Sequence, residues 1–218
     1  MKKRNSVFDK KGYYLYKNAL STETCDILSN VYHNLKESGK LNDRDTQVPG
    51  ALLLPHNDEL LNAIHEIISK KYEDFLGGMS LVPSYFYGRY YLNGNILHPH
   101  RDRSACELSA TLTIDYDKEW PLWIEDFNGN PQKVLMERGD LVFYHGCDLT
   151  HWRESFDGKY AIQLFLHYVN ANNSEADNIK KIRSERKDQD IYIKNNNRMR
   201  ITKSGWPWLR IRKINDKK

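Results

Sequence analysis

The sequence has few cysteines and no long apolar run. Cys25, Cys106 and Cys147 form neither a CxxC pair nor a zinc-like spacing, so they indicate neither a disulfide framework nor a structural zinc site. We expect buried, idle thiols in a reducing compartment. No stretch approaches the ~20 apolar residues of a membrane span, and the first residues lack the apolar run of a secretory signal. The sequence therefore predicts a cytoplasmic protein without a membrane partner, and it leaves the oligomeric state open.

Positive charge is concentrated at one end of the chain. Residues 171–218 contain 14 Lys and Arg against 6 Asp and Glu, a net charge of +8 in a chain whose total is +4. We therefore divide the chain into a domain of residues 1–170 and a basic C-terminal extension of residues 171–218. The extension mixes cations with Trp206 and Trp208, as a surface for nucleic acid or an acidic partner would. A solvated charged extension is the commoner meaning of such a composition.

Two helices are expected in the first half of the domain, and residues 179–190 of the extension are expected to form a solvated helix. Residues 12–20 are expected to form a strand. Ser21 or Thr22 then caps a helix that runs to about Ser38, and a second helix is expected from about Asn57 to Phe75. From Ser84 the pattern changes to short segments rich in β-branched and aromatic residues. These expected strands are residues 84–92, 108–116, 122–126, 141–146, 150–155 and 159–169. Helices followed by a run of strands predict an α+β domain that is mainly β, a sandwich or barrel supported by N-terminal helices.

The segment "ILHPHRDRSACE" carries the strongest chemical signal. In a strand, residues two apart point to the same face, so His100 and Asp102 converge while Arg101 points away. A third ligand is available 49 residues later, at His151 in "GDLVFYHGCDLTHWRE". Two histidines and one carboxylate form the facial set that holds iron(II) while leaving open coordination positions. We therefore predict that His100, Asp102 and His151 are metal ligands and form the catalytic centre.

Other histidines compete for these roles. His98 shares the parity of His100, but as a ligand it would give a His/His pair without a carboxylate in register. His145 is a second candidate for the distal ligand, although a place in a loop is the expected one for it. The remaining histidines are expected to be surface or satisfied polar residues, and they are His33, His56, His65 and His167.

The order of these segments resembles a known family. "YFYGRYYLNGNILHPHRD", "LSATLTIDYDKEWPLWIED" and "GDLVFYHGCDLTHWRESFDGKYAIQLFLHYV" are similar to the 2-oxoglutarate and Fe(II)-dependent dioxygenases, in particular the prolyl 4-hydroxylase-like branch and its small bacterial and phage members. The resemblance covers roughly Gly12 to Asn170. It implies a double-stranded β-helix, also called a jelly roll and cupin-like, with the N-terminal helices packed on its outer face.

The resemblance also implies the cofactors Fe(II) and 2-oxoglutarate, with O2 as co-substrate and ascorbate as an accessory reductant. The distal carboxylate of 2-oxoglutarate needs a buried cation. Lys159 matches the position where the family carries Lys or Arg, and we favour it over Arg153, which has the inward parity of His151. Tyr91 matches the position of a tyrosine near the co-substrate, and Thr111 faces inward on the next expected strand. Both are further candidates for cofactor binding.

The resemblance implies hydroxylation of an unactivated C–H bond, with release of succinate and CO2. A prolyl or other amino-acid side chain in a peptide or protein is the favoured substrate, because the similarity is to prolyl hydroxylases. Arg103 and Trp152 are candidates for substrate contacts, and residues 42–54 are a candidate lid. Two alternatives remain open: a nucleic-acid dealkylase on the same fold, and a non-catalytic jelly-roll binding module whose basic tail binds nucleic acid.

Overall fold

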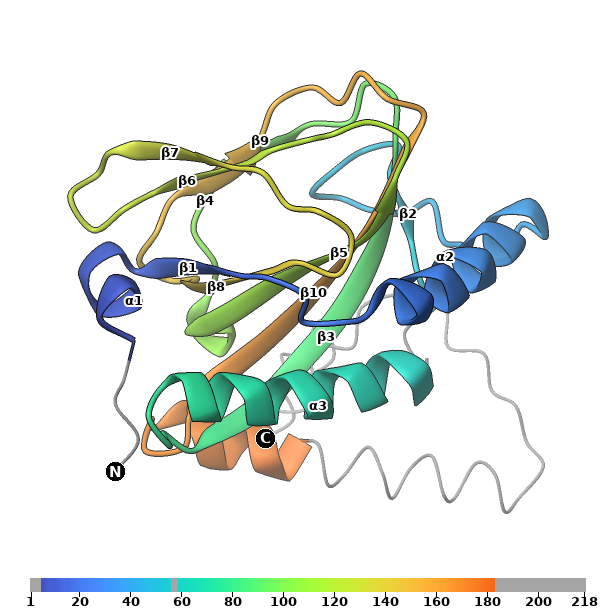
Figure 1. Ribbon diagram of the computed structural model, residues 1–218. Coiled ribbons are helices and arrows are strands. Elements are labelled where there is room, and N and C mark those ends of the chain that lie inside the picture. The colour runs from blue at the N-terminus through green and yellow to red at the C-terminus, as the bar shows by residue number, and fades with distance from the viewer. Residues whose placement is uncertain (1–4, 56–58, 183–218) are drawn as a thin grey trace, which may run out of the picture. The chain divides into compact units, whose positions relative to one another are not determined.

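Two antiparallel sheets form the body of the computed structural model, which describes residues 5–55 and 59–182 (Figure 1). The larger sheet has the order β1 (Tyr13–Tyr16), β8 (Leu141–His145), β5 (Leu108–Tyr116), β10 (Tyr160–Asn170), β3 (Leu81–Leu92) and β2 (Leu52–Leu53). The smaller sheet has the order β4 (Leu97–His100), β9 (His151–Arg153), β6 (Leu122–Glu125) and β7 (Pro131–Val134). Side chains from both sheets share one buried cluster, including Leu122 and Ile124 from the smaller sheet and Val142 and Tyr144 from the larger. The sheets therefore pack face to face.

The chain passes repeatedly between the two sheets. From β3 onward, β3, β5, β8 and β10 belong to the larger sheet, while β4, β6, β7 and β9 belong to the smaller one. This winding is the double-stranded β-helix, so the predicted fold class is confirmed. The expected strands are all present, but the short β2, β4 and β7 were not among them.

Alternation along β5 separates the two faces of the larger sheet. Ala110, Leu112 and Ile114 are buried in the apolar cluster beneath the helices, whereas Thr111 on the other face lines a pocket between the sheets. Since successive side chains of a strand point to opposite faces, Ser109 shares the inner face with Thr111. Ser109 and Thr111 are thus directed into the jelly roll.

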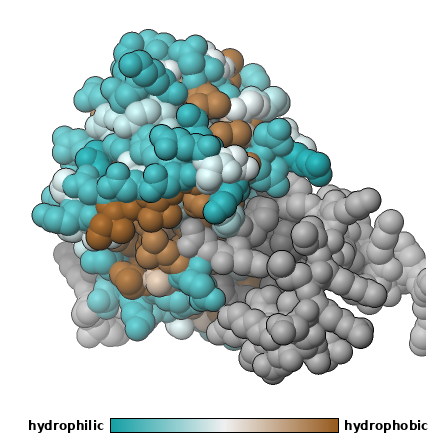
Figure 2. Space-filling view, turned by 90° about the vertical axis from the view of Figure 1, so that its right-hand side faces the viewer, coloured by the Kyte–Doolittle hydropathy of each residue, from teal (hydrophilic) through white to brown (hydrophobic). Residues whose placement is uncertain are grey.

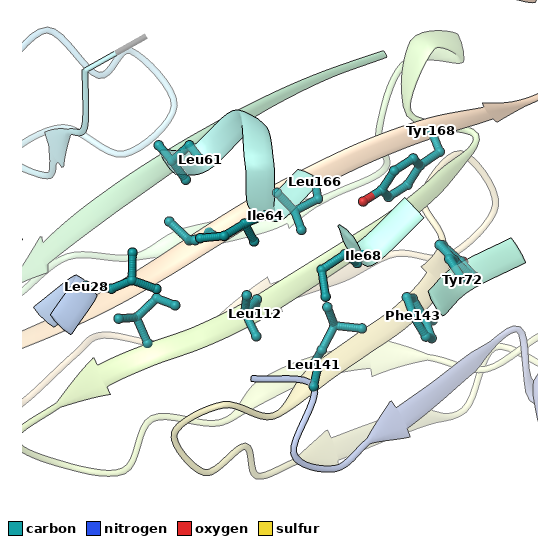
Figure 3. Close-up of a cluster of buried hydrophobic side chains, with 14 of the residues drawn as sticks. Leu28, Leu61, Ile64, Ile68, Tyr72, Leu112, Leu141, Phe143, Leu166 and Tyr168 are labelled. Atoms are coloured by element: carbon teal, nitrogen blue, oxygen red, sulfur yellow. The ribbon is translucent and has the colours of Figure 1, made fainter. Parts of the chain in front are cut away.

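Helices cover the outer face of the larger sheet, as predicted. α2 (Thr22–Glu37) begins after Ser21, whose side chain accepts a hydrogen bond from the Thr24 backbone N–H at 3.2 Å. α3 (Glu59–Phe75) packs its apolar stripe on β5, β8 and β10 (Figure 3). The labelled side chains of that cluster are Leu28, Leu61, Ile64, Ile68, Tyr72, Leu112, Leu141, Phe143, Leu166 and Tyr168. The short helices α1 (Ser6–Lys11) and η1 (Ser104–Cys106) were not predicted.

The surface is mostly hydrophilic in the view of Figure 2, with apolar side chains gathered in one area of that face. Ile27 on α2 and Ile67 on α3 are among the exposed large apolar residues. No helix within residues 5–55 and 59–182 is long and apolar enough to cross a membrane. Cys25 and Cys106 are buried free thiols, and Cys147 is half-buried.

The described chain continues past β10. Residues 175–182 are helical, and Ala176 and Ile179 are buried against Val82 and Val169. Most of the predicted basic extension, from residue 183 onward, lies outside the described residues. The division of the chain at residue 170 stays a prediction.

Candidate metal centre

A bulge in β4 sets the direction of the first histidine. β4 pairs with β9 so that Leu97 lies opposite Arg153 and His100 opposite His151, with an irregular register between them. Leu97 and His100 both line the pocket between the sheets, whereas His98 and Pro99 are exposed. His98 and His100 therefore do not share a face, contrary to simple alternation, because the bulge shifts the pattern by one residue.

The structure brings His100, Asp102 and His151 together. The Nε2 atoms of His100 and His151 each lie 3.8 Å from Oδ1 of Asp102, and one potential ligand atom from each residue falls within a group spanning 4.8 Å. The two imidazole rings have centroids 4.3 Å apart. His145, the alternative distal ligand, lies elsewhere: its ring stacks on Phe8 with a centroid distance of 4.9 Å.

Backbone carbonyls orient both imidazole rings. Nδ1 of His100 lies 2.8 Å from the carbonyl oxygen of His98, and Nδ1 of His151 lies 3.0 Å from that of Leu149. A carbonyl only accepts, so each Nδ1 carries the proton and each Nε2 keeps its lone pair. Both lone pairs thus belong to the atoms nearest Asp102. This is the arrangement that metal-binding histidines require.

Burial also keeps these side chains in the protonation state that binds metal. Burial lowers the pKa of His151 to about 4, and burial followed by the proximity of His151 lowers the pKa of His100. Both imidazoles are therefore neutral at neutral pH. Burial raises the pKa of Asp102 to about 6, so this carboxylate is held in a site that disfavours its charge. A cation bound at Oδ1 would relieve that cost.

The backbone of β8 and its following turn approaches Asp102 closely. The Asp102 N–H donates to the Gly146 carbonyl oxygen at 2.8 Å. A Cβ atom at Gly146 would overlap the Cys106 carbonyl oxygen, Oδ2 of Asp102 and Oγ of Ser109. Only glycine fits at this position. Its role could not be predicted from the sequence, because the contact joins residues 44 positions apart.

The pocket at the triad is lined by aromatic, aliphatic and polar side chains, and it contains a paired arginine. Tyr87, Arg89 and Phe165 are among its lining residues. The Nε of buried Arg89 donates to Oδ2 of buried Asp45 at 2.5 Å. The sequence analysis did not identify Arg89. The available signal was that Arg89 lies two residues before Tyr91 and so faces the same side of the strand, but its pairing with Asp45 could not be predicted.

The segment of residues 42–54 is anchored rather than free. Asp45 is bound to Arg89, and Oδ1 of Asp45 also accepts from the backbone N–H of Gln47 at 2.9 Å and of Val48 at 3.0 Å. Val48 and Ala51 are fully buried. The candidate lid is therefore attached to the domain through Asp45, Val48 and Ala51 in this structure.

Arg153 is buried inside the jelly roll without an acidic partner. Its side chain donates to the carbonyl oxygen of Trp120 and, at 3.4 Å, to Oε1 of Gln163, and its guanidinium lies 4.9 Å from the Trp120 ring centroid. Within the described part of the chain its Nε has no hydrogen-bond partner. Burial lowers the pKa of Arg153 to about 10. This is a cation whose counter-ion the described residues do not supply.

The other predicted cofactor residues divide into buried and exposed. Tyr91 is fully buried, and its hydroxyl accepts from Arg89 at 3.4 Å. Thr111 lines the pocket, and its buried Oγ1 has no partner among the described residues. Lys159 is exposed, and its backbone N–H donates to Asp117. The structure therefore does not bring Lys159 to the pocket, because β10 begins only at the next residue.

The predicted substrate residues lie outside the pocket. Trp152 alternates with the inward His151 and Arg153, so it stands on the outer face of the smaller sheet, stacked on Trp123 at 5.9 Å. Arg103 is exposed, with its guanidinium 4.8 Å from the Tyr85 ring centroid. The structure does not bring Trp152 to the metal centre, whereas Arg103 follows Asp102 directly.

No family model matches this sequence, and no curated protein does either. Solved structures do match. A prolyl-4-hydroxylase from Pseudomonas putida has a TM-score of 0.61 at 17% identity, covering 75% of this chain and 95% of its own. HygX from Streptomyces hygroscopicus, solved with nickel and 2-oxoglutarate, has a TM-score of 0.61 at 10% identity over 78% and 87% of the two chains. This chain has the fold of the 2-oxoglutarate and Fe(II) oxygenases. A viral collagen prolyl hydroxylase from Paramecium Bursaria Chlorella virus-1 shares this oxygenase fold, with a TM-score of 0.53 at 16% identity over 75% and 98%.

Proposed function

We propose that this protein is a 2-oxoglutarate and Fe(II)-dependent dioxygenase that hydroxylates a C–H bond. The observation that carries the proposal is the convergence of two Nε2 lone pairs and one carboxylate oxygen, from His100, His151 and Asp102, inside the oxygenase fold. Bound together, iron(II) and 2-oxoglutarate supply the oxidising chemistry, in which O2 and 2-oxoglutarate yield succinate, CO2 and a hydroxylated substrate. The chain's own contribution is to hold the metal on one side and leave the other side open.

Charge balance inside the jelly roll supports a dicarboxylate ligand. Arg89 is neutralised by Asp45, but Arg153 has no carboxylate within the described residues. A buried charge without a partner is costly, so a ligand that brings a carboxylate is favoured there. We assign the distal carboxylate of 2-oxoglutarate to Arg153, with the orphaned Oγ1 of Thr111 as a further hydrogen-bonding group. This assignment replaces Lys159, which is exposed.

A peptide or protein substrate that presents a prolyl or other amino-acid side chain fits the open side best. The wall beside the metal residues is formed by rings and aliphatic groups, among them Tyr87, Leu97 and Phe165. Such a wall excludes water and accepts an apolar ring like that of proline. Two of the structural neighbours are prolyl hydroxylases by name. Arg103 at the exposed edge is a candidate contact for the peptide backbone.

The experiment is turnover with a panel of proline-containing peptides, supplied with Fe(II), 2-oxoglutarate, O2 and ascorbate. We expect succinate to form together with a peptide that has gained one oxygen atom, as measured by mass spectrometry. His151→Ala is the control that removes one metal ligand and should yield neither product. A metal-loaded wild type that binds 2-oxoglutarate but yields no succinate with peptides or free amino acids would contradict the proposed reaction.

A further inference from the structure

The two oxygens of the Asp102 carboxylate have different surroundings. Oδ1 is the atom that lies 3.8 Å from both histidine Nε2 atoms. Oδ2 lies 3.0 Å from Oγ of Ser109, whose single proton could also go to the Cys106 carbonyl oxygen at 3.1 Å. The carboxylate is the favoured acceptor because it is charged. Ser109 is fully buried on the inner face of β5. One oxygen therefore faces the other two metal-ligand candidates, and the other oxygen is held by the protein.

Ser109 is in turn held by a buried histidine. Nδ1 of His167 on β10 lies 2.9 Å from Oγ of Ser109, and His167 is 2% exposed. The Ser109 hydroxyl has one proton. If Ser109 donates that proton to Asp102, then Nδ1 of His167 must carry a proton of its own and donate it to Oγ of Ser109. Nε2 of His167, which has no partner among the described residues, then carries a lone pair rather than an unpaired N–H group. That is the less costly of the two arrangements.

We propose that Ser109 and His167 are positioning residues that keep Asp102 a one-oxygen ligand of the metal. This role rests on the function proposed above. His167 donates to Ser109, Ser109 donates to Oδ2, and Oδ1 alone remains for the cation. A carboxylate free to rotate could offer both oxygens, and its second oxygen would occupy a coordination position that a two-point ligand such as 2-oxoglutarate needs.

The same residues do not form a second metal site. Asp102, Cys106 and His167 do place ligand atoms within 4.8 Å of one another. However, Sγ of Cys106 lies 2.9 Å from the Tyr85 hydroxyl, and Oδ2 of Asp102 lies 3.0 Å from Oγ of Ser109. Two of the three potential ligand groups therefore already have hydrogen-bond partners within the protein. The positioning role therefore requires one metal ion per chain.

Cobalt(II) titration tests the proposal without turnover, because calorimetry gives affinity and stoichiometry and the visible absorption of cobalt(II) reports its coordination. We expect Ser109→Ala to weaken cobalt binding about 10- to 100-fold and to change the absorption spectrum. Ser109→Thr keeps a hydroxyl and should retain both. His167→Asn keeps an amide donor and should bind more tightly than His167→Leu. The matched control is Ser84→Ala. Among the described residues the buried Ser84 hydroxyl donates to the Ala105 carbonyl oxygen alone, so its loss should leave cobalt binding unchanged.

The outcomes separate this role from the proposed function. Wild-type protein that binds no cobalt refutes the proposed function, and the positioning role with it. Wild type that binds one cobalt per chain, while folded Ser109→Ala binds it equally well with the same spectrum, overturns only the positioning role. Two cobalt ions per chain, with the second lost in Cys106→Ser, would also overturn it in favour of a second site.

Discussion

Arg153 gives the sharpest prediction, because removal of a buried arginine should here cost little stability. Burial lowers the pKa of Arg153 from 12.5 to about 10. The guanidinium is charged at neutral pH in both the folded and the unfolded chain, so the lowered pKa corresponds to a cost of roughly 3 kcal/mol to the folded state. Arg153→Met removes that cost and fills similar space with an apolar side chain.

The lost hydrogen bonds work in the opposite direction. Oε1 of Gln163 keeps the donor Thr113 at 3.1 Å. Among the described residues, the Trp120 carbonyl oxygen is therefore the acceptor that loses its donor. An unsatisfied buried acceptor costs about 1–3 kcal/mol. The net expectation is that Arg153→Met leaves the ligand-free protein unchanged or up to about 2 kcal/mol more stable.

Arg89→Met is the matched comparison. It would leave buried Asp45 without its partner, and breaking a buried ion pair in this way costs about 3–5 kcal/mol. Urea denaturation of the two variants and wild type measures these differences. The reasoning is refuted if Arg153→Met destabilises the ligand-free protein as much as Arg89→Met does.

The same denaturation series tests the ligand role of Arg153. A ligand present at 100 times its Kd stabilises a folded protein by about 2.7 kcal/mol. Manganese-loaded wild type should gain stability of this order from 2-oxoglutarate, and Arg153→Met should gain almost none. An equal gain in both proteins would show that the co-substrate carboxylate is bound elsewhere.

Three further substitutions test the placement of individual residues. Gly146→Ala should abolish metal binding, since the added methyl group would displace Asp102. The control is Gly39→Ala, where the added methyl group meets open space but φ is +65°; this variant should lose about 1 kcal/mol of stability and bind cobalt normally. Normal cobalt binding by Gly146→Ala would contradict the geometry. Lys159→Ala should leave the calorimetric affinity for 2-oxoglutarate unchanged because Lys159 is exposed, and a tenfold loss would restore it as the anchor. Trp152→Phe should leave metal and 2-oxoglutarate binding unchanged because Trp152 lies on the outer face of the smaller sheet; weaker binding of either ligand would refute that placement.

Sequence patterning predicted the fold because its signals are local. Residues 108–116 alternate in a way that a strand requires, and β5 has those bounds. The capping position of Ser21 was likewise local. The convergence of His100, Asp102 and His151 was predictable because few residue types can bind iron(II). The expected jelly roll then brings the distant segment that carries His151 close to His100 and Asp102.

The remainder depended on contacts that alternation does not encode. The bulge in β4 changes which of its residues face inward, and the pairing of Arg89 with Asp45 joins residues 44 positions apart. Lys159 matched a sequence position, but the chain enters β10 one residue later and leaves its side chain exposed. Whether a buried cation has an anionic partner is a property of the packed interior. The proposal of Arg153 as the anchor therefore rests on the structure, whereas the sequence supplied only its inward parity.

The most direct test of the central claim is an anaerobic titration of metal-free protein with Fe(II) and then 2-oxoglutarate, monitored by visible absorption. A keto acid chelated to iron(II) gives a charge-transfer band. We predict this band in wild type, its loss in His100→Ala, and a marked weakening in Arg153→Met at equal 2-oxoglutarate concentration. Folded wild-type protein that gives no band with saturating Fe(II) and 2-oxoglutarate would contradict the assignment of His100, Asp102 and His151 as the iron site of an oxygenase.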